Sequence, residues 1–268
     1  MNTVDKYTAI VLAADRGLSD PVAIATKSLC KALSPVGNTP MLFRVIKALQ
    51  LSQSIDSIIV VGPAKEILLS NQPLKFFLEQ DGIDWIDNGK TPCTSAQLAV
   101  QQIEDTKPTL ITTADHALLN PEMVDYFCQH AADTSADAML GLAKAEQVVQ
   151  AYPEVGRTKW KFQDHQYCSC NLFAFRTSRG RSLIEFWKQV EDDRKNPLRI
   201  ISKLGWRTAI RFVLRQITLN QALQALSTRL SLTIKPVLLP FPEAAIDVDT
   251  EQDLRLVEKI LEKRSVQG

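Results

Sequence analysis

The chain has 268 residues, of which 45% are apolar and 23% charged, and its formal net charge is +1. This is the composition of an ordinary globular protein, and it excludes a disordered chain. The near-neutral charge argues against a nucleic-acid partner, because proteins that coat nucleic acid are strongly basic. The five cysteines lack the spacing that is typical of a disulfide framework, which indicates reduced thiols. No leader pattern and no apolar run of about 20 residues is present, so we expect a cytoplasmic protein.

The first half of the chain alternates between short apolar runs and helical patterns. Residues 7–14, 57–61 and 109–113 read as buried strands. Residues 41–49 carry apolar side chains on one helical face, and residues 95–103 also read as a helix. Short, continuously apolar strands separated by helices predict a parallel sheet with both faces covered.

The pattern changes after about residue 140. Residues 138–143 read as a strand, and Trp160 and Phe162 alternate with lysines before a turn. A second strand over 167–175 follows this turn, which predicts a hairpin.

The C-terminal part of the chain reads as mostly helical over about 178–231. It returns to a strand at 246–248 and closes with a helix over 251–263, where Thr250 and Asp253 have the spacing of a capping box. We expect one domain over residues 1–268, with the helical segment 178–231 as an insertion.

Two segments near the N-terminus carry features of a phosphate site. The loop "LAADRG" over 12–17 follows a strand and contains a glycine, so its backbone N–H groups can meet phosphate oxygens. A plain turn between strand and helix explains the same residues. Lys31, in "KALSPVGNTPML", can neutralise charge on a triphosphate, or it can be a solvated surface lysine.

Three aspartates follow predicted strands. Asp115 ends the run "LITTAD", at the edge where open α/β sheets bind ligands, and a carboxylate there can hold Mg²⁺. Asp247 and Asp249 lie in "AIDVDT". One of these aspartates can reach the metal of Asp115 while the other caps the following helix. His116 is expected to pack or to make a structural hydrogen bond.

Four segments, taken in order, resemble a known family. "AIVLAADRG", "KALSPVGNTPML", "LITTADHALL" and "AIDVDTEQDL" are similar to the signatures of the MobA-like nucleotidyltransferases, over about 7–177 and 236–262. These enzymes are related to the molybdenum-cofactor guanylyl- and cytidylyltransferases and to the sugar-phosphate cytidylyltransferases. The resemblance implies an α/β, Rossmann-like GT-A fold, with a mostly parallel central sheet, a β-hairpin and a helical insertion.

The resemblance also implies roles for individual residues. Lys31 would contact phosphates, Asp115 would bind Mg²⁺, and Asp247 would be a second metal contact. Gly89 and Ser95 would contact the base and ribose, and Asn171 would lie on the acceptor side. The first loop would wrap the triphosphate through residues Leu12, Ala13, Ala14, Asp15 and Gly17.

The first loop departs from the family pattern at one position. Asp15 stands where the family usually has a glycine. A carboxylate repels a triphosphate unless a cation intervenes, and we expect the adjacent Arg16 to supply that cation and to hold the phosphates.

A basic segment lies outside the resemblance. Residues 176–215 contain eleven basic and four acidic residues, for a local net charge of +7 in a nearly neutral chain. Basic residues recur every four positions from 199 to 215, which predicts one basic helix side. We expect Arg207 and Arg211 to bind a phosphorylated acceptor, which is a small molecule or lipid-linked. The same segment suits peripheral contact with an anionic membrane, or it is simply a solvated face.

The sequence therefore favours a nucleotidyltransferase. An acceptor phosphate would attack the α-phosphorus of an Mg²⁺-bound NTP, with CTP or GTP as the expected nucleotide, and pyrophosphate would leave. Two alternatives stay open at this point. One is a GT-A-type glycosyltransferase that uses an NDP-sugar, and the other is a nucleotide-binding regulatory protein without catalytic activity.

Overall fold

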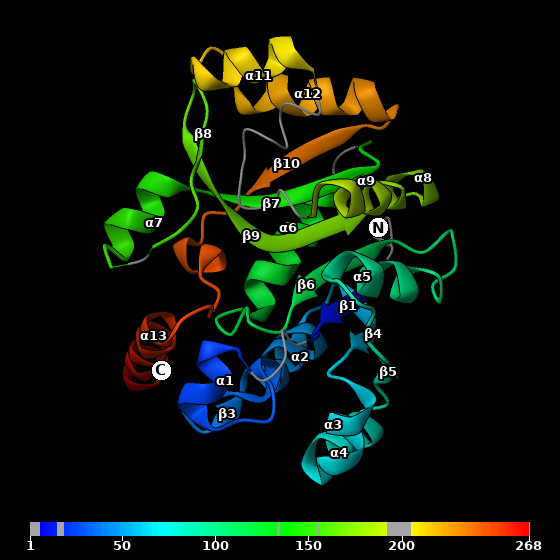
Figure 1. Cartoon of the computed structure of the whole chain (residues 1–268), viewed down its shortest axis with the longest axis vertical. Coiled ribbons are helices and arrows are strands. Elements are labelled where there is room, and N and C mark those ends of the chain that lie inside the picture. Colours follow the sequence, from blue (N-terminus) through cyan, green and yellow to red (C-terminus); the bar gives the residue numbers. More distant parts are fainter. Residues whose placement is uncertain (1–5, 15–18, 133–134, 155, 192–204, 268) are drawn as a thin grey trace.

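The structure is a computed structural model, and it describes residues 6–14, 19–132, 135–154, 156–191 and 205–267 (Figure 1). The strands are β1 (Tyr7–Leu12), β2 (Pro35–Val36), β3 (Thr39–Pro40), β4 (Ile55–Val61), β5 (Asp84–Ile86), β6 (Thr109–Thr113), β7 (Ala138–Lys144), β8 (Trp160–Lys161), β9 (Gln166–Phe175) and β10 (Ile234–Leu238).

The helices follow in the same labelling. They are α1 (Pro21–Thr26), η1 (Lys31–Leu33), α2 (Met41–Leu51), α3 (Lys65–Ser70), α4 (Gln72–Gln80), α5 (Pro92–Val100), α6 (Pro121–Ala132), α7 (Ala145–Ala151), α8 (Ser178–Arg181), α9 (Leu183–Val190), α11 (Trp206–Val213), α12 (Leu219–Leu230), η3 (Pro242–Ala245) and α13 (Glu251–Gln267). Within the described residues, the helical character predicted for 178–231 is confirmed.

The central sheet has the strand order β10-β7-β9-β6-β1-β4-β5, and β8 pairs with β9. Strands β1, β4, β5 and β6 run parallel, as do β7 and β10, whereas β9 is antiparallel to both β6 and β7. The expected mostly parallel sheet and the hairpin of β8 and β9 are therefore confirmed.

Helices cover both faces of this sheet, because strand side chains alternate between two cores. Tyr7, Ala9 and Val11 of β1 belong to the core under α2, α6 and α13. Ile10 belongs to the core under α5, α9 and α12. Each aliphatic side chain that is fully buried in these cores contributes about 1.5–3 kcal/mol. Packing in the two cores holds the strands in place, and the strands in turn position the loops at the edge of the sheet.

The strand order reverses direction beside β1. The chain runs from β1 to β4 and β5 on one side, and then returns to β6 on the other side of β1. In open α/β sheets, ligands bind in the crevice outside the carboxyl ends of the strands at such a switch point. The loops that follow β1 and β6 therefore lie where a ligand site is expected.

The strand predicted at 246–248 is wrong. These residues are extended but form no ladder, and the last strand is β10, which pairs in parallel with β7 at the sheet edge. The sequence pattern missed β10 because Pro236 interrupts it, and a proline within an apolar run argues against a central strand. As an edge strand, β10 tolerates that proline.

None of the helices in the described part of the chain combines the length and the apolarity that crossing a bilayer requires.

Candidate active site

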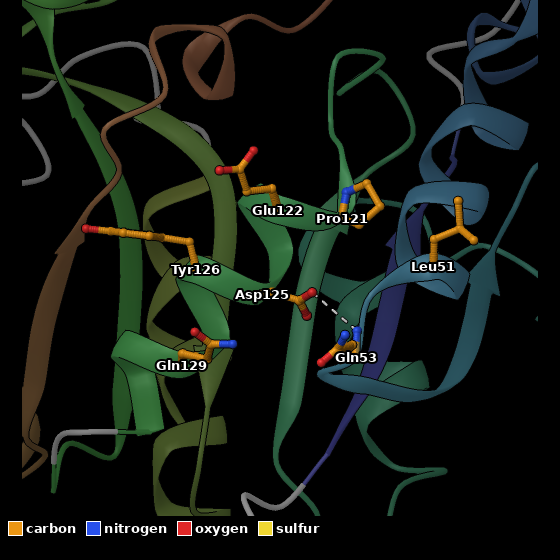
Figure 2. Close-up of a pocket in the computed structure, with 7 residues that line it drawn as sticks. All are labelled: Leu51, Gln53, Pro121, Glu122, Asp125, Tyr126 and Gln129. Atoms are coloured by element: carbon orange, nitrogen blue, oxygen red, sulfur yellow. Dashed lines mark hydrogen bonds between the residues drawn. The ribbon is translucent and has the colours of Figure 1, made fainter. Parts of the chain in front are cut away.

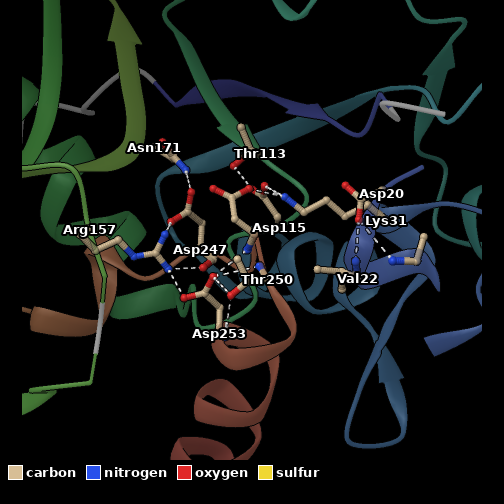
Figure 3. Close-up of polar contacts among 12 residues, drawn as sticks. Asp20, Val22, Lys31, Thr113, Asp115, Arg157, Asn171, Asp247, Thr250 and Asp253 are labelled. Atoms are coloured by element: carbon tan, nitrogen blue, oxygen red, sulfur yellow. Dashed lines mark hydrogen bonds and ion pairs between the residues drawn. The ribbon is translucent and has the colours of Figure 1, made fainter. Parts of the chain in front are cut away.

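Three carboxylates meet beyond the carboxyl end of β6 (Figure 3). Asp115, Asp247 and Asp249 each offer an oxygen, and these oxygens all lie within 4.8 Å of one another. Thr113, the last residue of β6, donates its hydroxyl to Asp115 Oδ1 at 2.6 Å. The backbone N–H of Val248 donates to the carbonyl oxygen of Asp115 at 3.0 Å. This backbone bond holds the extended segment 246–249 against the end of β6 and brings both of its aspartates to the cluster.

Lys31 enters the cluster from the opposite side, at the start of η1. Its largely buried ammonium Nζ lies 2.5 Å from Asp115 Oδ2 and 2.7 Å from Asp249 Oδ1. Burial lowers the pKa of Lys31, but the two carboxylates raise it by more, so the net shift is upward. Lys31 is therefore a charged ammonium in the site rather than a solvated surface residue.

Arg157 supports Asp247 from the loop between α7 and β8. Its guanidinium donates to the carboxylate and to the backbone carbonyl oxygen of Asp247, and it lies 3.4 Å from Asp253 Oδ1. Asn171, on β9, donates its Nδ2 to Asp247 Oδ2 at 3.2 Å. The Asp247 carboxylate is thus oriented by two side chains from separate parts of the fold.

Asp253 also caps α13. Its Oδ2 accepts from the backbone N–H of Thr250 at 2.9 Å, and the Thr250 hydroxyl accepts from the N–H of Asp253 at 3.2 Å. The predicted capping box is confirmed: Thr250 and Asp253, and not the side chain of Asp249, cap the start of α13. Asp249 is therefore available to the cluster, where it contacts Lys31.

The charges of the site are suited to a divalent cation. Among the described residues, ion pairs join two cations, Lys31 and Arg157, to four carboxylates, those of Asp115, Asp247, Asp249 and Asp253. Burial and the nearby charge of Asp115 raise the pKa of Asp247, although Arg157 acts to lower it. An excess of negative charge among closely spaced oxygens fits a hard cation that prefers oxygen ligands, such as Mg²⁺.

The loop that follows β1 begins beside the cluster. Leu12 ends β1, and the N–H of Ala13 donates to the carbonyl oxygen of Val61 at 2.8 Å. Gly62 packs so closely that a Cβ there would lie 3.0 Å from the backbone nitrogen of Ala14, and its φ is +84°. Only glycine suits this position, and it fixes the start of the loop at residues 12–14. The predicted contacts of Asp15, Arg16 and Gly17 lie outside the described residues.

A second loop packs onto the start of α5. The backbone N–H of Gly89 donates to the hydroxyl of the fully buried Ser95 at 3.0 Å. A Cβ at Gly89 would lie 2.5 Å from the Thr94 hydroxyl oxygen, so the residue must be glycine. The two positions that were predicted to contact base and ribose are therefore bonded to each other, and their nucleotide contacts stay a prediction.

His116 follows Asp115 in the chain but does not add charge to the site. The residue is buried, and burial lowers the pKa of its ring to about 4, so the imidazole is neutral near pH 7. The expectation that His116 packs is confirmed.

The structure does not bring Arg207 and Arg211 to the carboxylates. Both lie on α11, which is beyond the β10 edge of the sheet and far from α1 and α13 in Figure 1. Arg211 donates to the carbonyl oxygen of Gln216 and to Gln221 Oε1, each at 2.9 Å. Binding of the acceptor by these arginines stays a prediction.

Sequence reasoning missed Arg157. It is a single arginine in a loop that belongs to no quoted motif, and no periodic pattern marks it. For Asp249 the sequence left the choice between capping and metal binding open, since it could not show which acid caps α13.

A pocket of about 490 Å³ lies elsewhere, between the end of α2 and helix α6 (Figure 2). It is lined by Leu51, Gln53, Pro121, Glu122, Asp125, Tyr126 and Gln129. One of its two carboxylates, that of Asp125, accepts from the Ser52 hydroxyl at 2.6 Å and from the N–H groups of Gln53 and Ser54. This side chain fixes the turn before β4, and none of the lining residues belongs to the carboxylate cluster.

Sheet and site together define a Rossmann-like α/β enzyme of the GT-A-like type, with its acidic cluster at the strand ends. The model of one protein family, the MobA-like NTP transferase domain, matches residues 9–231. The chain belongs to this family and is a nucleotidyltransferase. Family membership thus favours the predicted nucleotidyltransferase over the glycosyltransferase and the regulatory protein. A comparison with curated protein sequences finds no match.

Three solved structures share the fold. A hypothetical transferase from Thermus thermophilus is 23% identical, with a TM-score of 0.75 over 93% of this chain and 99% of that one. A CMP:2-keto-3-deoxy-manno-octonic acid synthetase complexed with CTP is 11% identical, with a TM-score of 0.59 over 97% and 99%. A 4-diphosphocytidyl-2C-methyl-D-erythritol synthase from Anaerococcus prevotii is 14% identical, with a TM-score of 0.56 over 96% of each chain.

Proposed function

We propose that this enzyme transfers the NMP group of an Mg²⁺-bound CTP or GTP to a phosphorylated acceptor. An oxygen of the acceptor phosphate attacks the α-phosphorus in line, a new P–O bond forms, and the bond to the bridging oxygen breaks. Pyrophosphate leaves with the electron pair of the broken bond. The observation that carries this proposal is the ammonium of Lys31 placed between Asp115 and Asp249, at the edge of three clustered carboxylates.

The loop after β1 and Lys31 would bind the triphosphate. Residues 12–14 begin this loop beside β6, and backbone N–H groups together with Arg16 would hold the phosphates. Lys31 would offset the negative charge that develops on the phosphates in the transition state. A preorganised cation stabilises this charge without any rearrangement of the site. Such electrostatic stabilisation of the transition state is usually the largest single contribution to the rate of an enzyme.

Asp115 and Asp247 would hold the metal, and their geometry supports this role. The Thr113 hydroxyl orients Asp115, and Arg157 together with Asn171 orients Asp247. Held by these carboxylates, Mg²⁺ would supply positive charge that offsets the negative charge of the triphosphate. Because the supporting residues come from β6, β9 and the loop before β8, the two ligands are held by the fold itself.

The acceptor would approach from the β9 side. Asn171 lies there, bonded to Asp247, so an acceptor phosphate near Asn171 would also be near the metal ligands. Gly89 and Ser95, at the start of α5, would contact the base and ribose.

A panel of NTPs with Mg²⁺, scored by thermal shift, tests nucleotide binding first. We expect CTP or GTP to raise the melting temperature, because a ligand that binds only the folded state stabilises it. EDTA should remove the shift. Release of pyrophosphate with a panel of phosphorylated acceptors then tests turnover.

Lys31→Ala tests the site itself, with Lys27→Ala as the matched control. Lys27 is exposed and ends α1, four residues before Lys31. We expect Lys31→Ala to lower kcat by about 100-fold and Lys27→Ala to leave it nearly unchanged. Equal behaviour of the two variants, or no NTP-dependent shift across the panel, would contradict the proposal.

A further inference from the structure

Helix α11 carries an apolar ridge on its outer side. Trp206 is 68% exposed, and Ile210, Val213 and Leu214 are exposed beside it. These residues follow the spacing of one helical face. An exposed apolar ridge with a tryptophan is uncommon on a soluble surface, because large apolar side chains gain by leaving water.

The inner side of α11 is firmly attached. Ala209 is buried, and the rings of Phe212 and Phe162 pack edge to face with centroids 5.4 Å apart. Arg211 ties the end of the helix to Gln216 and Gln221. The helix is therefore held by its inner residues, and α11 lies at the outside of the molecule in Figure 1. The side chains of the apolar ridge remain exposed.

The described residues on and next to α11 that carry charge are basic. In the sequence, no Asp or Glu occurs between Asp193 and Glu243. Arg207 lies next to the ridge, with its guanidinium carbon 5.4 Å from the centroid of the Trp206 ring, and Arg215 follows the helix end in an exposed position. Cationic side chains next to an apolar ridge complement an anionic surface with an apolar interior.

We propose that α11 docks the protein on an anionic phospholipid membrane. Trp206, Ile210, Val213 and Leu214 enter the boundary between head groups and acyl chains, and the arginines contact lipid phosphates. Tryptophan suits this boundary because its ring is apolar and its N–H stays near polar groups. This inference does not depend on the proposed reaction.

The shape of the feature favours lipid over a protein partner. The ridge belongs to a single helix on the outside of the molecule, so a protein partner would need a matching groove with acidic walls. A lipid surface deforms around a ridge and supplies both apolar contact and phosphate charge. An acidic protein or a second copy of the chain would occupy the ridge only through such a groove.

Sedimentation with vesicles tests this docking. The full chain is mixed with vesicles of phosphatidylcholine alone or of phosphatidylcholine with phosphatidylglycerol. We expect binding to the anionic vesicles that weakens as salt is added, and little binding to the neutral ones. Failure to bind anionic vesicles would overturn the proposal, and so would self-association of the chain that is lost with Trp206→Ala.

Two pairs of variants locate the contact. Trp206→Ala should weaken vesicle binding by roughly tenfold, while Phe76→Ala, at a 65% exposed site on α4, should not. Arg207→Glu with Arg215→Glu should weaken it by at least about 25-fold, since each basic residue near the surface contributes about fivefold.

Lys47→Glu with Lys65→Glu changes the net charge equally on exposed positions of α2 and α3. Circular dichroism confirms that each variant is folded. Equal losses for a variant pair and its control would show that net charge or general apolarity is responsible, and would overturn the assignment to α11.

Discussion

The carboxylate cluster and the pocket beside α6 both contain aspartate side chains, but the two sites use them in opposite ways. In the pocket, Asp125 accepts from one hydroxyl and two backbone N–H groups, so its oxygens are occupied by the turn that they hold. In the cluster, Asp115, Asp247 and Asp249 face one another within 4.8 Å, a repulsive arrangement that Lys31 and Arg157 only partly offset.

This difference separates a structural carboxylate from a functional one. A carboxylate that accepts three hydrogen bonds from a single turn stabilises that turn. Carboxylates that the fold gathers together despite their repulsion must be held in place from outside, and they gain most when a cation arrives. The site is therefore indicated by its unbalanced charge and not by the volume of a pocket.

The largest effect is expected at the cluster. Asp115→Asn should lower kcat for pyrophosphate release by about 10²–10³, because one preorganised charge is lost at the metal position. The amide keeps the shape of the side chain and can still accept from Thr113, so the fold should be unchanged by circular dichroism. Asp84→Asn, at an exposed position on β5, is the control. Nearly wild-type turnover of Asp115→Asn would refute the assignment.

Arg157→Met should have the next largest effect, on stability. It leaves Asp247 and Asp253 without their partly buried cation, and the loss of one partner of such a pair costs about 3 kcal/mol. Urea unfolding measures this cost. Arg255→Met, which breaks an exposed pair with Glu251 on α13, should cost less than about 0.5 kcal/mol. If the two variants lose similar stability, Arg157 does not hold the cluster.

Lys31→Met should change metal binding in the opposite direction to turnover. Without the ammonium, the carboxylates repel one another more strongly, so Mg²⁺ should bind the nucleotide-free enzyme about tenfold more tightly. Isothermal titration measures the affinity, with Lys27→Met as the control. Weaker Mg²⁺ binding in Lys31→Met would mean that the lysine supports the metal ligands instead of competing with the metal.

Asp125→Asn should have the smallest effect, and only on stability. Burial raises the pKa of Asp125, but its hydrogen bonds lower it by more, so the folded-state pKa lies below the ordinary value of 3.8. The stability that it adds, about 1 kcal/mol, is present above that value and is lost as the pH falls through the folded-state pKa. Unfolding at a series of pH values should show the wild type and the variant converging in acid. Impaired turnover of Asp125→Asn would show that Asp125 is not purely structural, and would contradict the proposed difference between the two sites.

The sequence predicts the sheet well because its strands are short apolar runs between helical patterns. It also places Lys31 and Asp115, since both lie in segments whose order matches the family. It does not predict that Arg157 joins Asp247, because that contact spans 90 residues and depends on how a loop folds over β9. The same limit applies to α11, which packs through Ala209 and Phe212 and leaves Trp206 and Ile210 exposed.

The bounds of α11 limit how many residues of the basic row lie on one helix. The four-residue spacing of basic residues predicts one basic helix side; α11 begins after Gly205, where φ is +113°, and Arg215 lies past its end with a φ of +53°. Among the described members of that row, only Arg207 and Arg211 are on the helix. Spacing alone could not show that Arg215 lies past the end of the helix.

A crystal structure with Mn²⁺ in place of Mg²⁺ and the nucleotide that the panel selects tests the central claim most directly. The anomalous signal of manganese locates the cation without reference to any assumed ligand. We expect a peak in contact with carboxylate oxygens of Asp115 and Asp247 and with oxygens of the triphosphate. A bound nucleotide whose manganese lies away from these aspartates, or a nucleotide bound without any peak at the cluster, would contradict the account.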